Sequence, residues 1–102
     1  MAVKTGNYTY LLENTPSVLS FGAVGSKKES EGPLGQYFDV INPDSSFGES
    51  SWEKAESELQ KTALELALGK ASLNYDDLDV LFAGDLLNQC ISSSFAVRDT
   101  KI

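Results

Sequence analysis

The hydrophobic pattern near the end of the chain changes its period at one point. Residues 80–83, Val-Leu-Phe-Ala, form an apolar run that is far too short to span a membrane and is typical of a buried strand. Gly84 and Asp85 end this run. Helical spacing then relates Leu87, Ile91, Ser94, Phe95 and Arg98. The pattern predicts a strand, a tight turn and a helix, which is half of a parallel βαβ unit.

A long amphipathic helix is predicted over residues 51–70. Ser50 is expected as its N-cap, and Glu53, three residues later, completes a capping box. Gly69 is expected to weaken or end the last turn, and one more short turn is expected within residues 71–78. The apolar stripe of this helix comprises Trp52, Ala55, Leu59, Ala63, Leu66 and Ala67, and the positions expected to face solvent are Lys54, Glu58, Lys61 and Glu65.

The first half of the chain is predicted to supply two strands and a long loop. Residues 1–7 are interpreted as a frayed leader, residues 8–12 as a β-prone segment and residues 17–24 as a buried strand. Residues 26–50 are polar and rich in turn formers, so we expect a long irregular loop, either packed and functional or mobile. Its aromatic residues favour packing, and it is the stretch we expect partners to use.

The order strand, helix, strand, helix predicts the α/β class, with a mixed sheet that carries helices on its faces. A length of 102 residues allows at most one small domain, so residues 1–102 are interpreted as a single unit.

Charge and composition exclude several classes of function. The net charge of −7 argues against nucleic-acid binding and against unaided docking on an anionic membrane. The chain contains no histidine, which removes every Ser-His, Cys-His and His-metal arrangement. We expect no signal peptide, no transmembrane segment, no metal site and no cofactor, and the single cysteine is consistent with a reducing cytoplasm.

The turn at Gly84 and Asp85 is the candidate ligand-binding site. It lies between a strand end and a helix start, which is where open α/β sheets bind ligands. The alternative is that Asp85 caps the helix that follows, because a carboxylate near a helix N-terminus is favourable.

Other candidate groups have simpler structural interpretations. Cys90 lacks a base or a nearby lysine and is interpreted as a packing residue rather than a nucleophile. The hydroxyls of residues 92–94 also lack a base, so helix packing explains them better. Asp39, Asp44 and Glu49 could offer oxygens to calcium, but their spacing does not fit the twelve-residue calcium loop. Residues 32–35 lack the lysine of a phosphate loop and are interpreted as a turn.

Two segments resemble one known family. The first is Glu31-Gly-Pro-Leu-Gly35 with Phe38-Asp39, followed by Gly48-Glu-Ser-Ser-Trp-Glu-Lys-Ala-Glu56. The second is Ala83-Gly-Asp-Leu-Leu-Asn-Gln89, followed by Ile91-Ser-Ser-Ser-Phe-Ala96. Both are similar to the N-terminal part of the stage V sporulation protein AD family, and the order of elements from Tyr8 to Arg98 follows that family.

The resemblance implies a fold like that of thiolases and ketoacyl synthases, of which this chain is an N-terminal fragment. It also implies a non-enzymatic protein that binds dipicolinic acid, free or as its calcium chelate, and helps its uptake into the developing spore. The implied partners are other channel proteins of the spore inner membrane, and the implied location is cytoplasmic or peripheral at that membrane. The complete protein is expected to be a homo-oligomer.

The alternative is an acyl-transfer enzyme of the thiolase or ketoacyl synthase type in the complete chain. The family resemblance implies that the nucleophilic cysteine of such an enzyme lies beyond Ile102, so Cys90 is not that residue. The remaining pocket residues are also expected outside this segment, and no family site residue is carried over to it.

Overall fold

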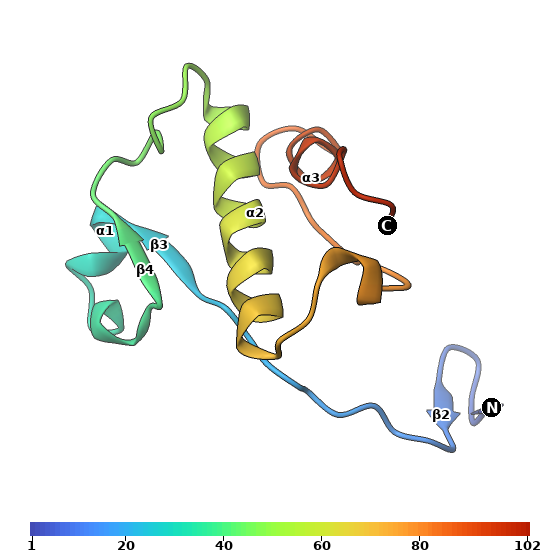
Figure 1. The fold of residues 1–102 in the computed structure, drawn as a ribbon. Coiled ribbons are helices and arrows are strands. Elements are labelled where there is room, and N and C mark those ends of the chain that lie inside the picture. The colour runs from blue at the N-terminus through green and yellow to red at the C-terminus, as the bar shows by residue number, and fades with distance from the viewer.

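The computed structural model describes all residues from Met1 to Ile102. Its largest element is α2, Trp52–Lys70. Figure 1 shows α2 in the middle of the molecule, with β3, β4 and α1 on one side and the C-terminal segment with α3 on the other. The helices and short strands confirm the α/β class.

Helix α2 agrees with the sequence-based prediction except at its cap. Ser51 has an extended backbone and is the N-cap, and its hydroxyl accepts a hydrogen bond from the Lys54 backbone N–H at 3.3 Å. The predicted cap, Ser50, is therefore wrong by one residue, and the carboxylate of Glu53 bonds elsewhere. The helix passes through Gly69 and ends at Lys70.

A parallel strand pair packs beside α2. Strand β3, Val24–Ser26, pairs with β4, Val40–Asn42, so that Val24 lies opposite Val40. The connection contains helix α1, Lys27–Ser30, and a 3-10 turn η1, Gly35–Tyr37. The segment expected as an irregular loop over residues 26–50 therefore contains three short regular elements, and a parallel pairing requires such a crossover.

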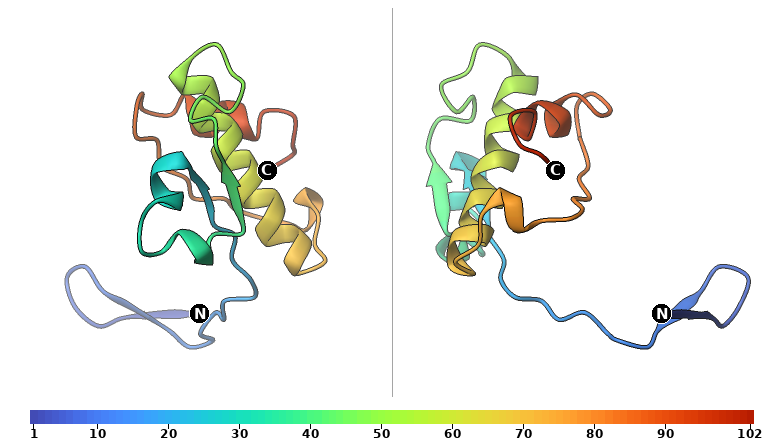
Figure 2. Two further views of the ribbon diagram at one scale, coloured as in Figure 1. Left: turned by 90° about the vertical axis from the view of Figure 1, so that its left-hand side faces the viewer. Right: turned by 45° about the vertical axis from the view of Figure 1, so that its right-hand side comes forward.

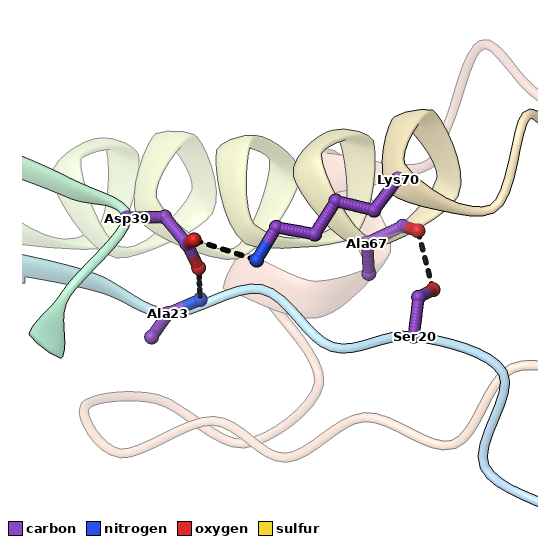
Figure 3. Close-up of polar contacts among 5 residues, drawn as sticks. All are labelled: Ser20, Ala23, Asp39, Ala67 and Lys70. Atoms are coloured by element: carbon purple, nitrogen blue, oxygen red, sulfur yellow. Dashed lines mark hydrogen bonds and ion pairs between the residues drawn. The ribbon is translucent and has the colours of Figure 1, made fainter.

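The predicted strand over residues 17–24 is extended but is assigned as a strand only from Val24. Figure 3 shows how this extended segment is held against the C-terminal half of α2. The Ser20 hydroxyl donates to the Ala67 carbonyl oxygen at 2.5 Å. One carboxylate oxygen of Asp39 accepts from the Ala23 backbone N–H at 2.8 Å, and the other accepts from the Lys70 ammonium. These side-chain contacts act together with backbone hydrogen bonds to the Ala23 carbonyl oxygen, which accepts the N–H groups of Asp39 and Val40.

The N-terminus forms a hairpin instead of a frayed leader. Strand β1, Ala2–Lys4, pairs antiparallel with β2, Tyr10–Leu12, and Val3 lies opposite Leu11. The interpretation of residues 1–7 as a frayed leader is therefore wrong, because residues 2–4 pair with residues 10–12. Strand β2 lies within residues 8–12 and confirms the β-prone segment predicted there. Figure 2 shows the hairpin apart from the rest of the molecule, at the end of an extended connection.

The predicted strand over residues 80–83 is not assigned as a strand, and Phe82 is 93% exposed. A strand needs a neighbour to pair with, and no neighbouring strand is bonded to this segment in the structure. The predicted short turn is present as η2, Tyr75–Asp77. The predicted helix is confined to α3, Ser92–Ala96, because Cys90 adopts a left-handed backbone with φ of 63° just before it.

The buried core is small and surrounds α2. Val24 and Gly25 of β3 are buried on one side, Ser92 and Ala96 of α3 on the other, and Ala55 and Leu68 of α2 between them. Many larger apolar side chains stay exposed. None of the helices combines the length and the apolar character that a membrane crossing requires.

Candidate functional site

The loop from Gly84 to Ile91 lies against the N-terminal half of α2 and is held by polar side chains of that helix. The Glu56 carboxylate accepts the Leu86 backbone N–H at 2.6 Å and the Leu87 N–H at 3.4 Å. It also accepts the Ser92 hydroxyl at 2.8 Å. Hydrogen bonds to an ionised acceptor are stronger than neutral ones, so Glu56 is the main anchor of the loop.

Glu53, one turn earlier, makes a second attachment. Its carboxylate accepts the Asn88 side-chain amide at 2.6 Å. Its backbone carbonyl oxygen lies 3.2 Å from the hydroxyl oxygen of Ser92. Ser92 is completely buried, so its hydroxyl must find an acceptor inside the protein. The two glutamates supply that acceptor.

Gln60 holds the start of the loop. Its side-chain amide donates to the Gly84 carbonyl oxygen at 3.2 Å and lies 3.3 Å from a carboxylate oxygen of Asp85. Glu53, Glu56 and Gln60 are separated by three and four residues, which places them on one face of the helix. The sequence pattern predicts Glu53 in a capping box and assigns no role to Glu56 or Gln60.

Asp85 caps α3 from a distance of eight residues. Its Oδ1 atom accepts the Ser93 backbone N–H at 2.9 Å, so the capping alternative describes this oxygen correctly. Partial burial opposes the charge, but hydrogen bonds from Ser93 and Gln60 outweigh it and hold the pKa of Asp85 below its ordinary value. Its Oδ2 atom is buried without a hydrogen-bond partner.

Gly84, the other predicted site residue, faces open space. No atom lies within 4 Å of the position that a Cβ would take there. The two predicted residues therefore lie together at one end of the anchored loop, with the Gly84 backbone accessible and Asp85 half-buried.

A groove of about 690 Å³ lies between α2 and the C-terminal segment, and its lining includes Glu53 and the end of the anchored loop at Ile91. The helix contributes residues expected to face solvent, among them Lys54, Glu58 and Lys61, and the far wall contains Phe95 and Arg98. The Arg98 guanidinium lies 5.3 Å from the centre of the Phe95 ring. The lining mixes both signs of charge and does not include Gly84 or Asp85.

Tyr75 closes one side of this groove. Its hydroxyl lies 3.1 Å from a carboxylate oxygen of Glu65. Burial, together with the hydrogen bond and negative charge of Glu65, raises the pKa of Tyr75 to about 12. The phenol therefore stays protonated and donates to Glu65 at neutral pH.

The other candidate groups are not brought together. Cys90 is exposed in the loop. The Asp44 carboxylate accepts the backbone N–H groups of Ser46 and Gly48, and the Ser46 hydroxyl. These bonds, led by that of the hydroxyl, hold the pKa of Asp44 below its ordinary value. Asp39 is engaged by Lys70 and Ala23, so both of these aspartates bind protein donors in this structure.

Comparison with known proteins gives one consistent result. The family model described as stage V sporulation protein AD matches residues 6–102. Stage V sporulation protein AD of Bacillus subtilis (strain 168) is 41% identical over 98 residues, which make up 96% of this chain and 29% of that protein. The chain thus spans about three tenths of the length of this curated relative.

Proposed function

The chain belongs to the stage V sporulation protein AD family, and on this basis we propose that the complete protein binds dipicolinic acid and helps its uptake into the developing spore. The observation that carries the proposal is the family match, which covers residues 6–102 and includes the anchored loop. The proposed fold of the complete protein is thiolase-like, with this chain as an N-terminal part of one domain.

The proposed contact with the ligand is the turn at Gly84 and Asp85. Dipicolinate is a planar pyridine with two carboxylates, and it chelates calcium. The open space over Gly84 allows a flat ligand to approach the backbone. The pKa of Asp85 lies below its ordinary value, so its carboxylate is charged at neutral pH and repels the free dianion. The calcium chelate, in which the cation offsets the charge of the dianion, therefore suits this position better.

The proposed role is binding without catalysis. The chain has no histidine that could activate a thiol, and its one cysteine is exposed in the loop. The alternative, acyl transfer of the thiolase type, requires a nucleophile and bases from the rest of the protein. The proposed partners are other channel proteins of the spore inner membrane and further copies of the complete protein, and the proposed location is cytoplasmic or peripheral at that membrane.

The test is calorimetric titration of the complete protein with sodium dipicolinate, with and without calcium. We expect saturable binding that is stronger with calcium and is weakened by Asp85→Asn. That variant keeps an oxygen acceptor for the Ser93 N–H. The matched control is Asp76→Asn, because Asp76 is an exposed carboxylate. An absence of heat at millimolar dipicolinate, or turnover of acyl thioesters, would reject the proposal.

A further inference from the structure

The conformation of the loop after Asp85 depends on contacts with α2 rather than on burial of its own side chains. Leu86 is 92% exposed and Leu87 is 50% exposed, so neither packs as a core residue. Phe82, just before the turn, is also exposed. A segment with so little apolar burial keeps one conformation only if polar contacts hold it.

Glu56 supplies the largest number of those contacts. Its carboxylate accepts the two backbone N–H groups that directly follow Asp85, those of Leu86 and Leu87. Because a peptide unit is planar, fixing the Leu86 N–H also fixes the orientation of the Asp85 carbonyl. The same carboxylate accepts the Ser92 hydroxyl at the far end of the loop. One side chain therefore sets both ends of the loop.

We propose that Glu56 is a positioning residue that holds the turn at Gly84 and Asp85 in the conformation that binds ligand. This inference rests on the proposed function. Glu56 does not line the 690 Å³ groove, and its oxygens are turned to the loop N–H groups and the Ser92 hydroxyl. It therefore acts on the ligand through the backbone of the turn and not by contact.

Helix α2 is a suitable base for this role. It is the longest element, and its other end is joined to the extended segment through Ser20 and to Asp39 through Lys70. A side chain that projects from such an element is placed more reproducibly than one that projects from a loop. The sequence separation of thirty or more residues between Glu56 and the donors that it accepts from makes the contact a tertiary one.

The experiment uses the complete protein and two substitutions. Glu56→Ala removes all three hydrogen bonds, whereas Glu56→Gln keeps one oxygen acceptor for the Leu86 N–H. Dipicolinate affinity is measured by calorimetry in the presence of calcium, and the amide resonances of Leu86 and Leu87 are followed by NMR. We expect affinity to fall about tenfold in Glu56→Ala and less in Glu56→Gln, since a hydrogen bond to a charged group contributes on this scale.

A matched control separates positioning from general stability. Glu58→Gln removes the same charge two residues away on the same helix, and we expect unchanged affinity and unchanged Leu86 and Leu87 resonances. Equal dipicolinate affinity in the wild type and both Glu56 variants would overturn the inference. If the wild type itself binds no dipicolinate, the proposed function fails. In that case unmoved Leu86 and Leu87 resonances in Glu56→Ala, which removes both backbone hydrogen bonds, would overturn the positioning role independently.

Discussion

The ammonium nitrogen of Lys70 lies 2.5 Å from a carboxylate oxygen of Asp39. The pair joins the last residue of α2 to the residue that precedes β4. The second oxygen of Asp39 accepts the Ala23 N–H, and the Lys70 ammonium lies 4.9 Å from the centre of the Phe21 ring. One ion pair thus connects the helix, the parallel strand pair and the extended segment that leads to β3.

This pair makes the stability of the region dependent on pH. The hydrogen bond from Lys70, followed by that from Ala23, holds the pKa of Asp39 below its ordinary value of 3.8. A carboxyl group with a lowered pKa in the folded state stabilises the fold above its unfolded pKa. That contribution is lost as pH falls through the folded value. We expect Asp39→Asn to accelerate amide hydrogen exchange at Ala23 at pH 7. At a pH low enough to protonate Asp39, the same substitution should have little effect, because the wild type has then lost the negative charge as well.

The matched control for that experiment is Asp76→Asn, which removes an exposed carboxylate elsewhere. Asp76→Asn should leave amide exchange at Ala23 unchanged, both at pH 7 and at the acidic pH at which Asp39 is protonated. Exchange at Ala23 that is equally fast in the wild type and in Asp39→Asn at pH 7 would show that the ion pair does not hold the extended segment.

The close contact of the extended segment with α2 predicts the cost of a methyl group at Gly22. A Cβ at this position would lie 2.6 Å from the Ala63 carbonyl oxygen and 3.0 Å from the Leu66 Cβ. Backbone atoms of the helix cannot move aside, so the segment itself would shift. We expect Gly22→Ala to lower the free energy of unfolding by about 1–3 kcal/mol, as overpacking does elsewhere. Chemical denaturation followed by circular dichroism measures the change.

Gly69 lies in the helix that Gly22 packs against, and a methyl group there is expected to have the opposite effect on stability. Apart from its chain neighbours and the nearby backbone of α2, no atom lies within 4 Å of the Gly69 Cβ position. Gly69→Ala should therefore stabilise the protein by about 0.5–1 kcal/mol, because alanine loses less conformational freedom in a helix. A loss of stability in Gly69→Ala, or none in Gly22→Ala, would contradict the packing described here.

The sequence predicted α2 well and the strands poorly, for a physical reason. A helix satisfies its own backbone hydrogen bonds, so an amphipathic stripe and a capping serine locate it within one residue. A strand depends on a neighbour, and the apolar segments at residues 17–23 and 80–83 have none in this structure. Of the N-terminal hairpin, only β2 was predicted, within the β-prone residues 8–12. Strand β1 was missed for the same reason, because residues 2–4 are a strand only through pairing with residues 10–12.

The anchored loop was predicted in part. The break in hydrophobic period correctly ended the apolar run at Gly84 and Asp85, because a change of period is a local signal. The predicted turn is displaced along the chain, since the backbone bends over residues 86–88 and turns at residues 89–91. The contacts of Glu53 with Asn88 and of Glu56 with Leu86 join residues thirty or more positions apart. Local patterns contain no information on such pairs. The available signal was the repeated polar position on one face of the helix at Glu53, Glu56 and Gln60.

Substitution of Ser50 and Ser51 tests which of the two serines caps the N-terminus of α2. The Ser51 hydroxyl accepts the Lys54 N–H, whereas the Ser50 hydroxyl lies 3.4 Å from the Lys54 ammonium. Ser51→Ala should destabilise the protein by about 1 kcal/mol, which is typical for loss of a capping serine. Ser50→Ala should change the free energy of unfolding by much less, because an exposed hydrogen bond of this length contributes little. Thermal or urea denaturation of both variants decides between the predicted and the observed cap, and a larger loss in Ser50→Ala would favour the former.

Tyr75 gives a spectroscopic prediction for the groove beside α2. Its hydroxyl bonds to Glu65, and burial together with that carboxylate raises its pKa to about 12. The protonated phenol is therefore favoured in the folded state, and its contribution to stability is present below about pH 10 and is lost as pH rises through about 12. The difference in tyrosinate absorbance between the wild type and Tyr75→Phe should titrate near pH 12, with native circular dichroism checked at each pH. Glu65→Gln should move that midpoint down towards 10. A midpoint near 10 in the wild type would show that the phenol is exposed and does not bond to Glu65.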